Sequence, residues 1–112
     1  MSQITTHILD TSLGKPAKGI LIRLEQSTFE NWSAVASGIT NEDGRISDLL
    51  PKETKLAHGN YRMIFEVKSY FEKQNIKSFY PSVTVEFEIS EDSHYHVPLL
   101  LNPFGYSTYR GS

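Results

Sequence analysis

The sequence contains no cysteine, and this absence excludes several classes of protein at once. A disulfide framework, a thiol nucleophile and a zinc site built on thiolates all require cysteine. The chain also has no basic run, and its formal net charge is −2. A surface that binds nucleic acid through phosphate contacts needs clustered Lys and Arg, so we expect no nucleic-acid partner.

Targeting and membrane signals are missing as well. No apolar run approaches the ~20 residues that span a membrane as a helix. The opening segment Met1–His7 lacks the charged and apolar regions of a signal peptide. The last residues do not form a peroxisomal Ser-Lys-Leu signal. We therefore expect a soluble cytoplasmic protein with no membrane contact.

What is present suits one domain spanning residues 1–112, since 38% of the residues are hydrophobic and 12% are aromatic. The apolar residues recur mostly with a period of two, which is typical of half-buried strands. We expect strands in the following ranges: Ile4–Asp10, Ile20–Glu25, Trp32–Thr40, Tyr61–Val67, Val83–Ile89, His94–Leu101 and Tyr106–Tyr109.

Turn residues separate these segments. Gly14–Gly19 reads as a loop, and Asn41–Gly44 ends in Asp-Gly, which favours backbone with positive φ. We expect Arg45 to begin a short strand that ends at Leu49–Pro51. Only Lys68–Asn75 has helical character. Roughly seven or eight short strands with close turns predict an antiparallel β-sandwich.

The segment from His94 to the end of the chain is unusual. Alternation predicts one core face, made of Tyr95, Val97, Leu99 and Leu101. His94 and His96 then share the opposite face, toward solvent or a partner subunit. Pro98 has no N–H to donate, which predicts an edge strand or a bulge there. The aromatic tail that follows is expected to be ordered rather than frayed.

Three other polar residues need an explanation. His7 lies on the strand face away from Ile4 and Ile8, and Arg45 directly follows a tight turn, where side chains are commonly displayed. His58 lies in a loop and is interpreted as an ordinary surface residue. Taken singly, each of these residues is more often a solvated side chain than a functional one. Zinc bound by His7, His94 and His96 is a weaker alternative, because no carboxylate accompanies them at a diagnostic spacing.

Several blocks of residues closely resemble the 5-hydroxyisourate hydrolase family, transthyretin-like enzymes of urate degradation. The most specific block is the terminal Tyr-Arg-Gly-Ser, Tyr109–Ser112, which separates these hydrolases from the hormone carriers of the same fold. The other matching blocks are Thr6–Ala17, Thr40–Arg45, Phe79–Pro81, His94–Leu101 and Pro103–Thr108.

The resemblance implies an all-β, transthyretin-like sandwich of two four-stranded sheets with one short helix. It also implies a homotetramer, a dimer of dimers with active sites at the dimer–dimer interface. The implied reaction hydrolyses 5-hydroxyisourate to 2-oxo-4-hydroxy-4-carboxy-5-ureidoimidazoline without a cofactor or a metal. The family's functional residues fall here on His7, Arg45, His96 and the tail Tyr109–Ser112.

In this scheme His7 and His96 orient and deprotonate the attacking water, because histidine titrates near pH ~6.5. Arg45 holds the substrate and stabilises negative charge on oxygen. Tyr109 packs on the flat substrate and bonds it. Ser112 contributes its hydroxyl or the terminal carboxylate. The alternatives are a transthyretin-like carrier of a flat aromatic ligand, an adhesion or scaffolding module, and a metal-dependent hydrolase.

Overall fold

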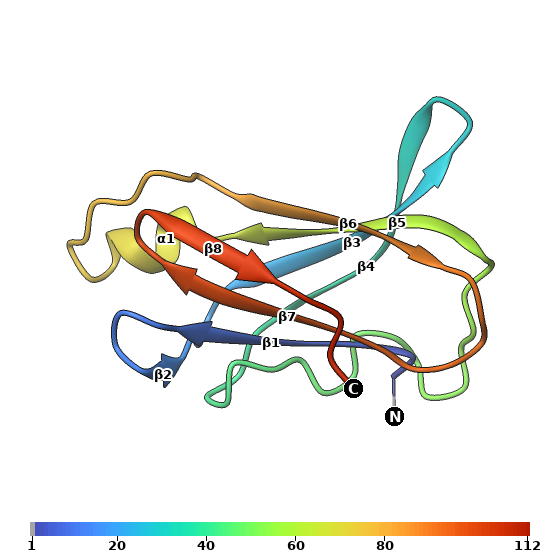
Figure 1. Cartoon of the computed structure of the whole chain (residues 1–112), viewed down its shortest axis with the longest axis horizontal. Coiled ribbons are helices and arrows are strands. Elements are labelled where there is room, and N and C mark those ends of the chain that lie inside the picture. Colours follow the sequence, from blue (N-terminus) through green and yellow to red (C-terminus); the bar gives the residue numbers. More distant parts are fainter. Residues whose placement is uncertain (1) are drawn as a thin grey trace.

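Two four-stranded sheets pack face to face in the computed structural model, which describes residues 2–112 (Figure 1). The β1 sheet has the strand order β2-β1-β7-β8, and the β3 sheet has the order β4-β3-β5-β6. The elements are β1 (Ile4–Asp10), β2 (Lys15–Pro16), β3 (Leu21–Thr28), β4 (Asn31–Ile39), β5 (Gly59–Glu66), α1 (Lys68–Glu72), β6 (Val83–Ile89), β7 (Tyr95–Asn102) and β8 (Gly105–Thr108). The expected sandwich with one short helix is confirmed.

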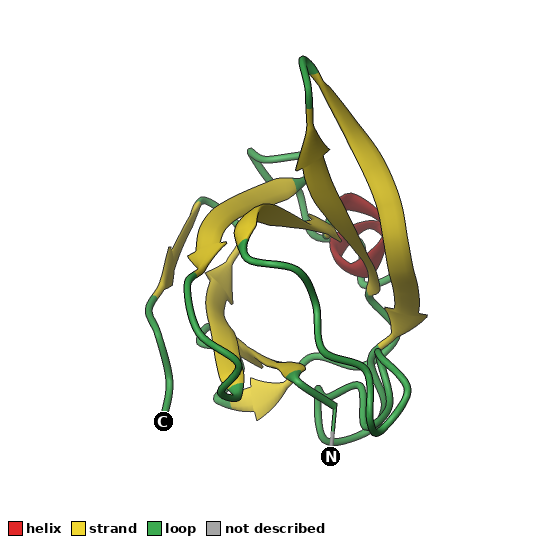
Figure 2. Cartoon of the chain, turned by 90° about the vertical axis from the view of Figure 1, so that its right-hand side faces the viewer, coloured by secondary structure: helices red, strands yellow, loops and turns green. Residues whose placement is uncertain are grey.

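The core lies between the sheets, as the alternation predicts. Strand β1 buries every second residue from Ile4 to Asp10, and β7 buries its predicted core face completely. Figure 2 shows the sheets curving around this core, with α1 on one side. Phe71 of α1 is also buried. Within residues 2–112 no helix has the length and apolar character needed to cross a membrane.

One strand pairing departs from the antiparallel expectation. Strands β1 and β7 are parallel, with Ile4 opposite Tyr95 and Asp10 opposite Leu101. The other strand pairs of the described residues are antiparallel. Parallel neighbours need a long crossover, and here the whole segment between β1 and β7 supplies it. Residues from the beginning and the end of the chain therefore lie side by side.

The strand expected to begin at Arg45 does not form. Arg45 makes only an isolated bridge to His7, and the chain then continues irregularly. The physical reason lies in the spacing of the residues that reach the core. Ile46, Leu49 and Leu50 are all buried, and this spacing does not fit the period of two that a strand requires.

Pro98 lies neither in an edge strand nor at a bulge, contrary to the sequence-based expectation, since the β1–β7 register runs through it without a shift. It is buried in β7, which lies between β1 and β8. The Pro98 carbonyl accepts a 2.6 Å hydrogen bond from the Thr108 hydroxyl, at the end of β8. Because the β8 ladder stops at Thr108, no backbone carbonyl of that ladder lies opposite Pro98. A missing N–H is therefore tolerated inside the sheet.

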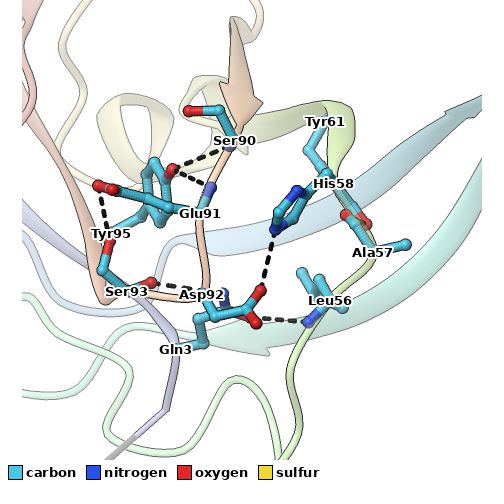
Figure 3. Close-up of polar contacts among 10 residues, drawn as sticks. All are labelled: Gln3, Leu56, Ala57, His58, Tyr61, Ser90, Glu91, Asp92, Ser93 and Tyr95. Atoms are coloured by element: carbon cyan, nitrogen blue, oxygen red, sulfur yellow. Dashed lines mark hydrogen bonds and ion pairs between the residues drawn. The ribbon is translucent and has the colours of Figure 1, made fainter.

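Polar contacts fix the loop that leads into β7 (Figure 3). The Tyr95 hydroxyl accepts hydrogen bonds from the backbone N–H groups of Ser90 (3.0 Å) and Glu91 (3.3 Å). The Gln3 side chain donates to the carbonyl of Ser93 at 3.3 Å. These bonds attach the β6–β7 loop to β7 itself and to the residue that precedes β1, so the start of β7 is held firmly.

Candidate active site

A tight turn brings Arg45 to His7. The Asn41 carbonyl accepts from the Gly44 N–H at 2.9 Å, and the Asn41 side-chain oxygen accepts from the Arg45 N–H at 3.1 Å. The Ile8 N–H donates to the Gly44 carbonyl at 2.9 Å, which ties the turn to β1. His7 and Arg45 consequently form an isolated antiparallel bridge.

Gly44 is required at this contact for two reasons. Its φ is +71°, in the left-handed region that side chains rarely adopt. A β-carbon on Gly44 would also lie 2.5 Å from the Ile8 carbonyl oxygen and 3.1 Å from Cβ of Pro16. The turn can therefore approach β1 closely only with glycine, and this approach sets the position of Arg45.

Two histidines and a threonine form the next part of the site. Thr5 and His96 are directly opposite in the parallel β1–β7 register. The Thr5 hydroxyl is 2.8 Å from Nδ1 of His96 and 2.7 Å from Nε2 of His94. The bond to Thr5 occupies Nδ1 of His96, so Nε2 is the nitrogen of that ring that can exchange a proton with a substrate or water.

The tail after β8 packs on His96, and its order agrees with the sequence-based expectation. The Gly111 N–H donates to the His96 carbonyl at 2.8 Å. Arg110 lies over the Tyr95 ring, with its guanidinium carbon 4.2 Å from the ring centroid. This cation–π contact and the Gly111 bond hold the terminal residues in place.

A cavity of about 430 Å³ opens where these segments meet. It is lined by Thr5, Arg45, His94, His96, Tyr109, Gly111 and Ser112. Four of the five residues predicted from the sequence therefore share one cavity. The fifth, His7, adjoins it through its bridge to Arg45. The cavity is the size expected of a small-molecule site.

Burial and positive charge favour the neutral form of both predicted histidines by lowering their pKa. Burial lowers the pKa of His7 below its ordinary value of 6.5, and the charge of Arg45 lowers it further, while the Asp43 backbone acts in the opposite direction. Burial is also the largest cause that lowers the pKa of His96, followed by Arg45, His94 and His7. Neutral imidazoles beside a fixed cation can accept a proton near pH 7.

Sequence reasoning missed three residues of the cavity wall. Alternation along the first strand places Thr5 on the same face as His7 but gives it no role, and Gly111 stands out in the sequence only as part of the terminal Tyr109–Ser112 motif. His94, which is expected on the outward face of its strand and has no role in the implied reaction, lies in the wall. His58 lies elsewhere, in an exposed 2.9 Å pair with Asp92 (Figure 3). Across residues 2–112 no group of three His, Asp or Glu side chains is arranged to hold a metal ion.

Known proteins are similar to this chain in both sequence and fold. A family model described as the HIUase/Transthyretin family matches residues 4–111. The 5-hydroxyisourate hydrolase of Salmonella dublin is 49% identical over 110 residues, which cover 97% of this chain and 80% of that protein.

Two solved structures show the same fold. The 5-hydroxyisourate hydrolase of Klebsiella pneumoniae superposes with a TM-score of 0.85 and 34% identity, covering 97% of this chain and 98% of that one. Sea bream transthyretin in complex with thyroxine superposes with a TM-score of 0.90 and 30% identity, covering 97% and 94%. A hydrolase and a transthyretin that binds thyroxine are thus about equally similar to this chain in backbone, so the fold alone does not separate hydrolysis from ligand binding.

Proposed function

The chain belongs to the HIUase/Transthyretin family, and we propose that it is an enzyme that hydrolyses 5-hydroxyisourate. The observation that carries this proposal is the placement of two neutral histidines, His7 and His96, beside Arg45 at one cavity. Water needs a base to attack an amide-like carbonyl, and the developing oxyanion needs a positive partner. A carrier of a flat aromatic ligand needs neither.

In the proposed mechanism His7 and His96 orient and deprotonate the attacking water. His96 acts through Nε2, since its Nδ1 is bonded to Thr5. The lowered pKa of each histidine keeps the imidazole unprotonated at neutral pH. After attack, the resulting imidazolium donates its proton to the leaving nitrogen of the opened ring. Positioned acid–base groups of this kind contribute about 10²–10⁴ in rate.

Arg45 stabilises the charge that attack places on the carbonyl oxygen. Its guanidinium remains protonated throughout and offers a planar set of N–H donors, which suits the urea-like edge of 5-hydroxyisourate. The bridge between Arg45 and His7 keeps the base and the oxyanion partner adjacent. Removing one such donor typically costs about 10²–10³ in kcat.

Tyr109 and Ser112 hold the substrate from the tail side of the cavity. The Tyr109 ring packs on the flat bicycle, and its hydroxyl bonds a polar edge. Ser112 lines the same wall and contributes a hydrogen bond to the substrate. The tail therefore acts in binding, and the two histidines act in proton transfer.

The site is completed by assembly into a homotetramer, a dimer of dimers in the cytoplasm. Support comes from the openness of the single-chain site, because Tyr109 is 58% exposed and Arg45 and Ser112 are also exposed. Water exclusion strengthens the electrostatic interactions that a hydrolase uses, and a neighbouring subunit would supply it. Light scattering coupled to size exclusion tests the tetramer directly.

The activity is tested by generating 5-hydroxyisourate from urate and following its decay in the ultraviolet. Chelator-treated protein should accelerate the decay far beyond the spontaneous rate. His7→Asn and His96→Asn should each lose at least about 10²-fold in kcat, while His58→Asn, at an exposed pair outside the cavity, should remain as active as the wild type. A folded protein that leaves the spontaneous rate unchanged would refute the proposal.

A further inference from the structure

Thr5 lies between two imidazoles and hydrogen-bonds to both of them. Its Oγ1 atom is 2.7 Å from Nε2 of His94 and 2.8 Å from Nδ1 of His96. The parallel register places Thr5 directly beside His96. The two histidines are two positions apart and stack, with ring centroids 6.3 Å apart and planes at 24°. Thr5 is therefore a single hydroxyl shared by two stacked rings.

The Thr5 hydroxyl has only one proton, which restricts how the three groups can bond. When it donates to one ring, it must accept from the other. If Nδ1 of His96 donates to Thr5, then Thr5 donates to Nε2 of His94, and Nε2 of His96 is left unprotonated. If the direction reverses, Nε2 of His96 carries the proton. The direction of these two hydrogen bonds thus decides whether Nε2 of His96 faces the cavity as a base or as an acid.

We propose that Thr5 and His94 are positioning residues that set the tautomer of His96 and present its Nε2 to the cavity as the base. This inference rests on the proposed function, and it extends that function to two residues that the family resemblance does not assign to the reaction. The second ring nitrogen of a functional histidine is commonly fixed by a hydrogen-bond partner, which determines where its proton resides. Thr5 is that partner here, and His94 determines which way Thr5 points.

The same hydrogen bonds through Thr5 also let protons move between His96 and His94 during the reaction. When Nε2 of His96 accepts a proton from water, Nδ1 of His96 passes its own proton to the Thr5 oxygen. The Thr5 hydroxyl proton moves in turn to Nε2 of His94. One N–H bond breaks at His96 and one forms at His94, so the positive charge moves to His94. When Nε2 of His96 gives its proton to the leaving nitrogen, the shifts reverse: Nε2 of His94 returns a proton to the Thr5 oxygen, and the Thr5 hydroxyl proton moves to Nδ1 of His96. His96 thus never becomes an imidazolate, and the starting tautomers are restored.

The first test compares Thr5→Val with Thr5→Ser in the intact assembled protein. Valine keeps the branched shape and removes the hydroxyl, whereas serine keeps the hydroxyl and removes the methyl group. We expect Thr5→Val to lower kcat by about 10- to 100-fold, the range typical for loss of a partner that orients a functional histidine. KM for 5-hydroxyisourate should change much less, and Thr5→Ser should recover most of the lost kcat.

A matched control separates this effect from a general strand substitution. Thr84 is exposed on β6, so Thr84→Val makes the same chemical change away from the cavity and should leave kcat unchanged. His94→Asn removes the imidazole that bonds to the other side of the Thr5 hydroxyl, and like Thr5→Val it should lower kcat. Wild-type kcat and pH profile in Thr5→Val, or equal losses in Thr5→Val and Thr5→Ser, would overturn the proposal.

A second readout does not depend on turnover. Nitrogen-15 NMR of the imidazoles in the substrate-free protein reports which nitrogen of His96 is protonated. Wild type and Thr5→Ser should show a proton on Nδ1, and Thr5→Val should shift the population toward Nε2. Unchanged tautomers in Thr5→Val would refute the positioning role. Absence of turnover in the wild type would instead refute the proposed function, while the NMR result would still decide the role of Thr5.

Discussion

Gly111 lies so close to the His96 imidazole that a β-carbon at its position would force the ring or the tail to move. A β-carbon there would overlap Cδ2 of the ring and lie 3.1 Å from Cγ. The Gly111 N–H also bonds to the His96 carbonyl at 2.8 Å. The tail therefore contacts this histidine through both backbone and ring, and the contact with the ring leaves no room for a side chain.

Gly111→Ala should displace the tail and move the ring of His96. We expect kcat/KM for 5-hydroxyisourate to fall by about 10²-fold, because displacement of a reacting group by about 1 Å has that effect. The melting temperature should change little, since Gly111 is only half-buried. Gly105→Ala is the control, because its β-carbon would meet Asn102 at an ordinary 3.6 Å. Equal activity of the two variants would contradict this account.

Arg45→Gln should reduce activity and also change its pH dependence. Loss of the guanidinium removes the partner of the oxyanion, which should lower kcat by about 10²–10³-fold. The positive charge of Arg45 lowers the pKa of both His7 and His96. The acidic limb of the pH–rate profile should therefore move to higher pH in the variant. Arg23→Gln, at an exposed pair with Glu66, should leave both the rate and the profile unchanged.

In the wild type the acidic limb of kcat/KM should have its midpoint below pH 6.5. Both histidines are needed unprotonated, and burial lowers the pKa of each below 6.5 in the folded protein. Activity should therefore persist on acidification past 6.5 and fall only as pH passes through the lowered values. A midpoint above 6.5 would show that the essential histidine is not one of these two.

The same shifts predict how stability depends on pH. The unfolded chain binds more protons than the folded chain between pH 6.5 and the lowered pKa values, so the free energy of unfolding should decrease as pH falls through that window. This contribution is fully present above pH 6.5. His7→Asn and His96→Asn should each weaken the dependence in denaturant titrations at several pH values. An unaltered slope in both variants would contradict the assignment.

Gly44→Ala and Gly14→Ala should separate backbone strain from steric overlap. Both glycines have positive φ, +71° and +68°, so both substitutions incur the left-handed penalty of about 1–2 kcal/mol. Only at Gly44 does the new β-carbon meet backbone, at 2.5 Å from the Ile8 oxygen. Urea unfolding should show Gly44→Ala to be about 1–3 kcal/mol less stable than Gly14→Ala. Equal stability of the two would mean that the turn relaxes away from β1.

The histidines of the site could be predicted because they depend on local alternation. A period of two decides which face a side chain occupies, so the outward orientation of His7 and His96 follows from their own strands. The turn before Arg45 could also be predicted from the sequence, because Asp-Gly favours positive φ at Gly44. Family motifs then added Tyr109 and Ser112, which no periodicity would have identified.

The errors arose where one segment depends on another. Pairing of β1 with β7 is parallel, and nothing within either strand encodes that register. Without it, Thr5 cannot be placed beside His96. For the same reason the sequence predicts an edge strand or a bulge at Pro98, since the end of the β8 ladder is known only once the strands are paired. The sequence also predicts a strand after Arg45, but the residues that become buried there do not alternate.

The parallel pairing of β1 and β7 also has a kinetic consequence. Thr5 and His96 are 91 positions apart, and contacts of such long sequence separation require closure of a large loop, which slows folding. The hairpins of the β3 sheet can form before that closure, but the cavity cannot. During refolding, hydrolysis will therefore return only after the first and seventh strands have paired, while circular dichroism follows the earlier growth of the sheets.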